Sequence, residues 1–359
     1  MSRQPRSSGH FRTRYEQDLR LLGTGLERAS FAVLVIALGG FPFLATPFQL
    51  DLAAQVFLAT VGALSLMLLT GYAGQISLGH AGLMAAGAFT VGILFRETGA
   101  PFWITLPAAA AVGALLGVIF GLPSLRLRGL YLAVSTLALH FVVIYIGGEY
   151  ESRWGFSTGI VIDPPTVGGI SIVNPRAWYF ILLAAAAATL LMCLNLLRSR
   201  SGRAWRAIRA HETVAEALGI GIASYKLLAF VISSAITALS GALFAYYRGF
   251  VSVEAFSLFL TVQYLAMVII GGMGSLLGAV LGALFVTIFP YLIEAGLLSL
   301  PAAQSYASVL FAVNYAAFGL VMIVFLMFEP LGLVGIWRRI QTYFLLWPFK
   351  HRPVTGGSG

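Results

Sequence analysis

Residues 52–82 have the sequence LAAQVFLATVGALSLMLLTGYAGQISLGHAG, and this stretch decides the fold class. Its first part, Leu52 to Thr70, is an uncharged apolar run, about as long as the roughly 20 residues that cross a bilayer as a helix. Its second part, Gly71 to Gly82, is rich in glycine and carries neither charge nor proline. Irregular backbone at membrane depth survives only where protein buries it or water lines it. We therefore predict a membrane helix followed by a buried, broken segment.

The composition extends this prediction to the whole chain. Of its 359 residues, 59% are hydrophobic and 10% are charged, against about 45–50% and about 25% in soluble domains. We predict an all-α polytopic membrane protein with about ten transmembrane helices. The third and eighth candidate spans are short, so we expect their true ends to lie in glycine-rich flanks. The candidate spans are Ala29–Thr46, Leu52–Thr70, Leu83–Phe95, Phe102–Ser124, Leu130–Gly148, Ala177–Leu197, Leu227–Tyr247, Leu258–Gly271, Leu277–Leu292 and Ser308–Phe328.

The basic residues orient the chain in the membrane. With ten spans, 18 of the 22 Lys and Arg residues fall on one side, in the arm 1–28, at Arg126 and Arg128, in the loop 198–226 and in the tail 329–359. Cytoplasmic loops carry such an excess, so we expect both termini to be cytoplasmic. The transmembrane domain then extends over residues 29–328, with an outer loop at 149–176. The polar, basic arm argues against a cleavable signal peptide. We expect no nucleic-acid partner, because no segment outside the spans is long enough for a basic soluble domain.

The broken segment is the first candidate site. Broken helices with small polar side chains recur where transporters handle their cargo, so we predict that this segment lines or gates a pathway. In a further glycine cluster, GGMGSLLGAVLGA at 271–283, Gly271, Gly274 and Gly282 recur at an offset of 200 from Gly71, Gly74 and Gly82, which is only a weak indication of a repeat. The alternative is that the glycines permit tight helix packing and that His80 satisfies backbone carbonyls. The predicted pathway or gate residues are Gly71, Gly74, Gln75, Ser77, Gly79, His80, Gly271 and Gly274.

The inner loop, residues 198–226, contains the second candidate site. Thr213 and Glu216 fit a capping box, which starts a helix, and Gly219 stands where a left-handed residue would end it. We predict a short cytoplasmic helix from Val214 to Leu218 that docks a partner; the alternative is a mere turn. The residues predicted for this element are Arg206, Arg209, Thr213, Val214, Ala215, Glu216, Leu218 and Gly219.

The residue patterns that other functions need are missing. The five His residues are scattered, so no HExxH pair forms, and neither lysine belongs to a GxxxxGK[ST] phosphate loop. The single cysteine, Cys193, excludes a disulfide framework or a thiolate metal site. We find no chain of acidic residues across the spans, which argues against a proton- or sodium-coupled carrier. His140 lies deep in the fifth span and is either a functional residue or a neutral imidazole bonded across helices. We expect no catalytic residue, no metal and no bound cofactor.

Six segments in chain order carry a resemblance to a known family: GYAGQISLGHAGLMAAGAFT (71–90), LRLRGLYLAVSTLAL (125–139), GRAWRAIRAHETVAEALGI (202–220), AFVISSAITALSGALFAYYRG (229–249), GGMGSLLGAVLGALF (271–285) and FEPLGLVGIW (328–337). Together they resemble the ABC-type permeases of branched-chain amino acid importers, most closely the LivM-type member of the LivH/LivM pair. The resemblance implies a complex in the bacterial cytoplasmic (inner) membrane. Its partners would be a LivH-like second permease, two ABC ATPase subunits that use ATP and Mg, and an extracytoplasmic substrate-binding protein.

The resemblance also gives the inner loop a role, because its short helix would couple the permease to the ATPase. Ala215 and Gly219 match the second Ala and the Gly of the EAAxxxG signature of ABC permeases. The family's Glu position is Thr213 here and no IxLP follows, which leaves the individual contacts open. Related permeases carry leucine, isoleucine and valine, but close relatives serve urea, amides or organic acids. A stand-alone channel or a secondary carrier is a further alternative.

Overall fold

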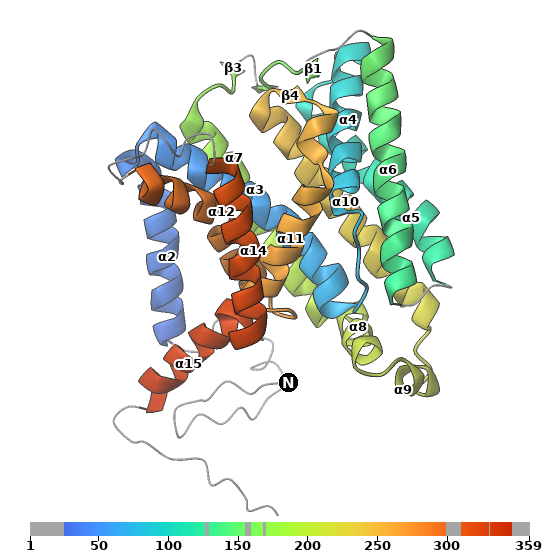
Figure 1. The fold of residues 1–359 in the computed structure, drawn as a ribbon, viewed down its shortest axis with the longest axis vertical. Coiled ribbons are helices and arrows are strands. Elements are labelled where there is room, and N and C mark those ends of the chain that lie inside the picture. Colours follow the sequence, from blue (N-terminus) through green and yellow to red (C-terminus); the bar gives the residue numbers. More distant parts are fainter. Residues whose placement is uncertain are drawn as a thin grey trace, which may run out of the picture.

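The computed structural model describes residues 25–125, 129–154, 159–167, 170–298, 310–329 and 331–346. These residues form a bundle of long helices with two small two-stranded sheets at one end (Figure 1). Its helices are α2 (Gly25–Leu44), α3 (Pro47–Leu66), the π-helix η1 (Met67–Tyr72), α4 (His80–Thr98), α5 (Phe102–Ser124), α6 (Leu130–Arg153), α7 (Pro175–Arg198), α8 (Arg200–Ala210), α9 (Glu212–Ala217), α10 (Ile222–Arg248), the 3₁₀-helix η2 (Val253–Phe256), α11 (Leu258–Gly271), α12 (Leu276–Leu298), α14 (Leu310–Phe328) and α15 (Gly332–Leu346).

Long apolar helices dominate the structure. Among the described residues, seven helices are long and apolar enough to cross a membrane, and two shorter apolar helices, Arg28–Leu44 and Ala316–Phe325, accompany them. The chain is therefore an all-α polytopic membrane protein, as predicted. α4, which carries His80, Arg96 and Glu97, is not among the seven. The number of ten spans accordingly stays a prediction.

The two short predicted spans gain their length in different ways. α4 begins at His80, inside the glycine-rich flank. α11 instead keeps the predicted ends, Leu258 and Gly271, so the expectation of an extension into its glycine flank is wrong. Gly272 has a φ of +114°, which only glycine adopts readily, and this conformation stops α11. The additional length of that span comes from η2, which precedes α11.

α10 is the central helix and packs against α5, α4 and α3. Buried hydroxyl groups join it to α3: the Oγ atoms of Ser65 and Thr237 lie 2.8 Å apart, and Ser233 Oγ donates to the Ser65 carbonyl oxygen at 2.9 Å. Interhelical bonds of this kind matter in a membrane because lipid gives helices no hydrophobic reason to associate. Hydrogen bonds as well as packing therefore hold α10 against α3.

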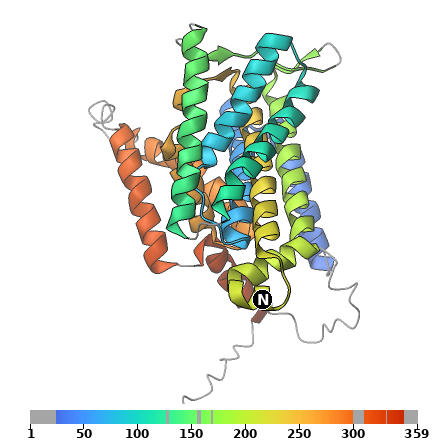
Figure 2. The same ribbon diagram turned by 90° about the vertical axis from the view of Figure 1, so that its right-hand side faces the viewer.

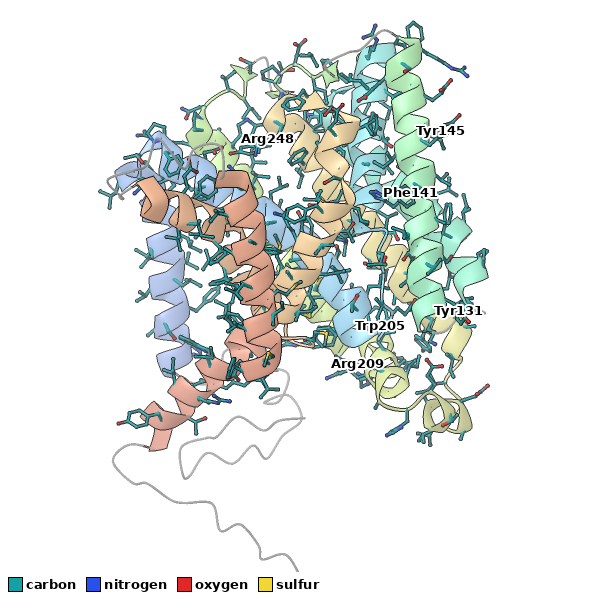
Figure 3. All side chains as sticks on the ribbon, viewed as in Figure 1. Tyr131, Phe141, Tyr145, Trp205, Arg209 and Arg248 are labelled. Carbon is teal, nitrogen blue, oxygen red and sulfur yellow. The ribbon has the colours of Figure 1, made fainter. Side chains whose placement is uncertain are left out.

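The two ends of the bundle differ (Figure 2). α8 and α9 lie at one end, and the strands lie at the other. The strands pair antiparallel, β1 (Ile160–Val161) with β4 (Phe250–Val251) and β2 (Thr166–Val167) with β3 (Ile170–Ser171). Figure 3 shows Arg209 at the α8–α9 end and Arg248 at the strand end.

Some predicted boundaries lie outside the described residues. They include the arm before Gly25, the pair Arg126 and Arg128, and the tail after Leu346. The described part of the tail is not simply extended chain, because it contains the helix α15. The cytoplasmic position of both termini therefore stays a prediction.

α6 turns an apolar face away from the bundle. Tyr131, Phe141 and Tyr145 on this helix are exposed and point outward in Figure 3. In a membrane protein such a face contacts lipid or another subunit, because the bilayer core contains no water.

Candidate functional site

The broken segment consists of residues 73–79, between η1 and α4. The chain leaves α3 through π-helical turns, a geometry that is rare and frequent at functional sites. Backbone N–H groups of the segment bond back to η1, from Ala73 to Leu68 O at 3.1 Å and from Gln75 to Leu69 O at 3.1 Å. Leu78 N–H is instead bonded to Thr136 Oγ1 of α6 at 2.9 Å. Side chains of a neighbouring helix thus replace the missing helical bonds, as irregular backbone away from water requires.

The polar side chains of this segment are buried. Gln75 is 4% exposed, and its Nε2 donates to the Lys226 carbonyl oxygen at the start of α10 at 3.0 Å. Ser77 and His80 are also buried, and the imidazole of His80 lies 4.5 Å from the ring of Tyr264 on α11, measured between centroids. Gly79 lies against α6, where an added Cβ would be 2.4 Å from the Thr136 carbonyl oxygen. Gln75, Ser77, Gly79 and His80 are therefore embedded between helices, while Ile76 is exposed.

Each of the two buried imidazoles has one ring nitrogen without a hydrogen bond to the residues that the structure describes. Within the described part of the chain, neither His80 Nε2 nor His140 Nδ1 has a hydrogen-bond partner. The roles predicted for His80 and His140 therefore stay predictions. Gly82 of α4 and His140 of α6 mark a close contact, since a Cβ on Gly82 would lie 2.6 Å from His140 Cα.

Arg209 of α8 brings the two candidate sites together. Its Nη1 donates to the carbonyl oxygen of Gly71. The aliphatic part of Arg209 packs on Gly74, where an added Cβ would lie 3.3 Å from Arg209 Cγ. A Cβ added at Gly274 would lie 2.8 Å from Arg209 Nη1. Gly74 and Gly274 have φ values of +71° and +88°, so their backbone also favours glycine. Gly271, three residues before Gly274, is the last residue of α11 and is buried where this helix approaches Gly278 of α12.

The basic part of the predicted inner loop is a helix, α8, and not a loop. Gly202, Ala204, Trp205 and Ile208 form its buried face. Trp205 is fully buried, and its Nε1 donates to the Tyr225 carbonyl oxygen of α10 at 2.8 Å. Arg206 donates to Leu197 O at 2.9 Å and to Gly202 O at 3.2 Å. The small and apolar residues between the arginines are a helical pattern that the sequence analysis missed.

α9 begins earlier than predicted and without the predicted cap. It starts at Glu212, and the residue before it, His211, makes no side-chain capping bond. Thr213 is exposed within the helix, so the capping box with Glu216 is wrong. Glu212 instead forms an ion pair with Lys226 Nζ of α10, at 2.5 Å.

The end of α9 has the predicted glycine. Gly219 has a φ of +81°, its N–H bonds to Glu216 O at 2.9 Å, and Ile220 N–H bonds to Ala215 O at 3.1 Å. This pair of bonds is a Schellman motif. Ala215 is buried, while Val214 and Leu218, one turn apart, are 56% and 75% exposed. α9 thus fixes one face against the protein and presents an apolar pair outward.

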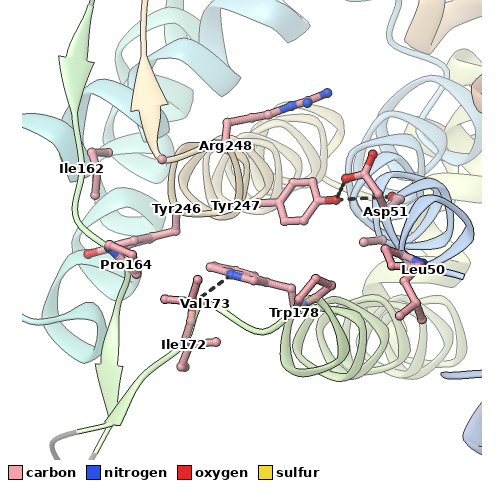
Figure 4. Close-up of a pocket in the computed structure, with 14 residues that line it drawn as sticks. Leu50, Asp51, Ile162, Pro164, Ile172, Val173, Trp178, Tyr246, Tyr247 and Arg248 are labelled. Atoms are coloured by element: carbon pink, nitrogen blue, oxygen red, sulfur yellow. Dashed lines mark hydrogen bonds between the residues drawn. The ribbon is translucent and has the colours of Figure 1, made fainter. Parts of the chain in front are cut away.

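Two neighbouring cavities open at the strand end, and sequence analysis did not identify them. They have volumes of about 360 and 300 Å³ and share Tyr247 and Arg248, the last residues of α10. In the larger one, Tyr247 donates from its hydroxyl to the carboxylate of Asp51 near the start of α3 (Figure 4). Asp51 and Arg248 each lie one residue outside a predicted span, and a lone charge at the end of an apolar run is the signal that could have revealed them.

Comparison with known proteins gives consistent matches. The profile of the family described as "Branched-chain amino acid transport system / permease component" matches residues 48–328. The chain is 33% identical over 281 residues to the high-affinity branched-chain amino acid transport system permease protein LivM of Salmonella typhimurium, and 32% identical to that of Escherichia coli. Each match covers 72% of this chain and 66% of the relative, just under two thirds of its length. A probable LivM permease of Methanocaldococcus jannaschii is 30% identical over 63% of this chain and 66% of its own. No solved structure matches.

Proposed function

Because the chain belongs to the family of branched-chain amino acid transport permeases, we propose that it is the membrane-spanning subunit of an ABC importer for branched-chain amino acids. With a second, LivH-like permease it would form the pathway in the bacterial cytoplasmic membrane. Two partner ATPases would use ATP and Mg to drive transport, and an extracytoplasmic binding protein would deliver the substrate. The members of this family are transport subunits and not enzymes, so this chain itself would bind no nucleotide.

The observation that carries the proposal is the outward apolar pair on α9. Val214 and Leu218 are the large apolar side chains of a helix that otherwise turns Ala215 inward. α9 lies beyond the bundle at the end where the basic residues of α8 gather (Figure 2). A rigid apolar knob of this kind suits a groove on a partner protein. We assign the groove to the ATPase.

Two contacts would carry motion of α9 into α10. The ion pair between Glu212 and Lys226 joins α9 to the first turns of α10, and Trp205 of α8 bonds to Tyr225 O in the same turns. A displacement of α9 by the closing ATPases would therefore rotate α10 and the helices packed on it. Such rigid-body movement is a common form of switching in proteins.

A third contact would carry the motion into the broken segment. Arg209 holds the Gly71 carbonyl oxygen and packs beside Gly74 and Gly274. When α8 moves, this bond would pull on the segment between η1 and α4. Glycine backbone absorbs such rotation at low cost. Residues 71–80 would thus act as part of the gate, and the buried Gln75, Ser77 and His80 would anchor it between helices.

The proposal is tested by gentle purification of the full-length protein from its native membranes, with identification of its companions by mass spectrometry. We expect a second permease and one or two P-loop ATPases. The purified complex, with its binding protein, should then drive ATP-dependent uptake of labelled leucine, isoleucine and valine into proteoliposomes.

Two results would contradict this proposal. If the protein emerged alone or as a homo-oligomer under conditions that preserve other ABC complexes, a channel or carrier would replace the importer. If the complete complex imported urea, an amide or an organic acid and none of the three amino acids, the machinery would stand and the substrate would be wrong.

A further inference from the structure

The larger cavity at the strand end contains two opposite charges on different helices. Asp51 lies in the second turn of α3, and Arg248 is the last residue of α10. Both line the cavity of about 360 Å³, a volume within the range of small-molecule sites. Figure 4 shows Arg248 and Tyr247 extending from α10 toward the helix that carries Asp51.

Each charge is held in place by neutral groups. The carboxylate of Asp51 accepts from Tyr247 Oη on one oxygen and from Gln55 Nε2 on the other, the latter at 2.7 Å. The guanidinium of Arg248 lies 5.8 Å from the ring centroid of Phe244 and 6.0 Å from that of Tyr247. Among the described residues, neither Asp51 nor Arg248 takes part in an ion pair. Both groups therefore retain the capacity to bind an opposite charge.

The remaining wall of the cavity is largely aliphatic and aromatic. Its apolar side chains include those of Leu50, Ala54, Ile162, Ile172, Val173 and Trp178. Trp178 is fixed by a bond from its Nε1 to Ile172 O at 3.1 Å and by an edge contact with Tyr247 at 5.7 Å between centroids. An aliphatic chain of a few carbons would gain from contact with this wall, since its burial removes apolar surface from water.

We propose that this cavity binds a free aliphatic α-amino acid on its way through the permease. Asp51 receives the α-ammonium group, Arg248 receives the α-carboxylate, and the apolar wall receives the side chain. The inference rests on the proposed function and deepens it, because it places substrate selection in this chain as well as in the binding protein.

The charge arrangement distinguishes an amino acid from the other candidate substrates. A 2-hydroxy acid has the carboxylate alone and would leave Asp51 without a cation while adding a second negative charge nearby. Leucinamide has the ammonium alone and would leave Arg248 without an anion. Urea has neither charge and too little apolar surface to use the wall. Only the zwitterion satisfies both groups, and charge-assisted hydrogen bonds are the strongest polar contacts that proteins make.

The test measures binding of ligand analogues to the purified, complete permease and ATPase complex, without the binding protein. Saturation-transfer-difference NMR titrations give dissociation constants for L-leucine, 2-hydroxy-4-methylpentanoate and leucinamide. For the wild-type complex we expect leucine to bind at least about 10-fold more tightly than either analogue. In Asp51→Asn the preference for leucine over the hydroxy acid should fall to within about 3-fold, with the preference over leucinamide largely retained. In Arg248→Gln the preference for leucine over leucinamide should fall to within about 3-fold, with the preference over the hydroxy acid largely retained.

Matched controls separate a binding role from a structural one. Glu254→Gln and Arg176→Gln remove charges near the same end that do not line the cavity, and should leave both preferences unchanged. Asp51→Glu keeps the charge and should keep the preference over the hydroxy acid. If Asp51→Asn does not yield a folded complex, the Arg248→Gln pair of measurements decides.

Three results would overturn the inference: no leucine signal from the wild-type complex, equal weakening of all three ligands in both variants, or unchanged preferences. Uptake of leucine by the complete transporter is measured separately. If uptake occurs while the variants keep the wild-type preferences, the cavity assignment fails and the proposed function stands. If the transporter carries another substrate and not leucine, the proposed function fails.

Discussion

Truncation of the exposed pair on α9, Val214→Ala with Leu218→Ala, tests the proposal that α9 docks a partner ATPase. Complete burial of a Val or Leu side chain is worth about 1.5–3 kcal/mol. Because Leu218 is 75% exposed and Val214 is 56% exposed, most of that gain is still available to a partner. Alanine keeps a small part of the contact. We therefore expect the double variant to lose about 2–3 kcal/mol of docking free energy, a roughly 30- to 150-fold weaker affinity.

Because both side chains are exposed, we expect the double variant to keep the stability of the wild-type permease. Substitutions at exposed positions usually change the free energy of unfolding by less than about 0.5 kcal/mol, and alanine favours the helix. Thermal unfolding of the purified variant should therefore match that of the wild type. Val161→Ala is the matched control, because Val161 is 70% exposed but lies on β1 at the opposite end of the bundle.

The assay titrates the partner ATPase onto the permease in lipid nanodiscs and measures ATP-dependent uptake in parallel. Uptake should fall with docking in the double variant and stay at the wild-type level in Val161→Ala. An affinity within 3-fold of the wild type, with normal uptake, would refute the assignment of α9 as the docking element.

Three further substitutions probe the path from α8 to the broken segment. The double substitution Gly74→Leu with Gly79→Leu should abolish uptake while membrane insertion persists, because Gly79 abuts the Thr136 carbonyl and Gly74 has a positive φ. Gly40→Leu is the control, because nothing lies within 4 Å of a Cβ added there, and it should leave uptake in the same vesicles unchanged. Arg209→Ala should lower ATP-dependent uptake at least about 10-fold without loss of ATPase docking, since it removes the bond to Gly71 O. Arg209→Lys should restore part of the uptake. Equal uptake by the wild type and both variants would exclude a coupling role for Arg209. Trp205→Ala should cost about 3–5 kcal/mol of unfolding free energy, seen as a lower melting temperature and yield, because this side chain is fully buried; a melting temperature equal to that of the wild type would show that α8 does not depend on it.

The fold class and most helix positions follow from local features of the sequence. An apolar run of about 20 residues has few alternatives to a membrane helix. α5 has the predicted ends, Phe102 and Ser124, because prolines and glycines mark both ends of that run. The end of α9 was equally predictable, since a glycine with positive φ at Gly219 is a local requirement. The start of α9 was not predictable in this way. The capping pattern placed the cap at Thr213, but the helix begins at Glu212, whose carboxylate pairs with Lys226 of α10, and this distant partner is no part of the local pattern.

The sequence by itself determined that the chain is a helical membrane protein, where its helix-breaking glycines lie and that a short helix ends at Gly219. Those properties depend on neighbours within a few residues along the chain. The tertiary structure alone decided that Arg209 reaches Gly71, 138 residues away, and that Tyr247 reaches Asp51 across 196 residues. Such contacts arise when α8, α10 and α3 pack together, and they depend on how helix faces fit. For that reason the link between α8 and the broken segment, and the paired charges of the cavity, emerge only once the bundle is assembled.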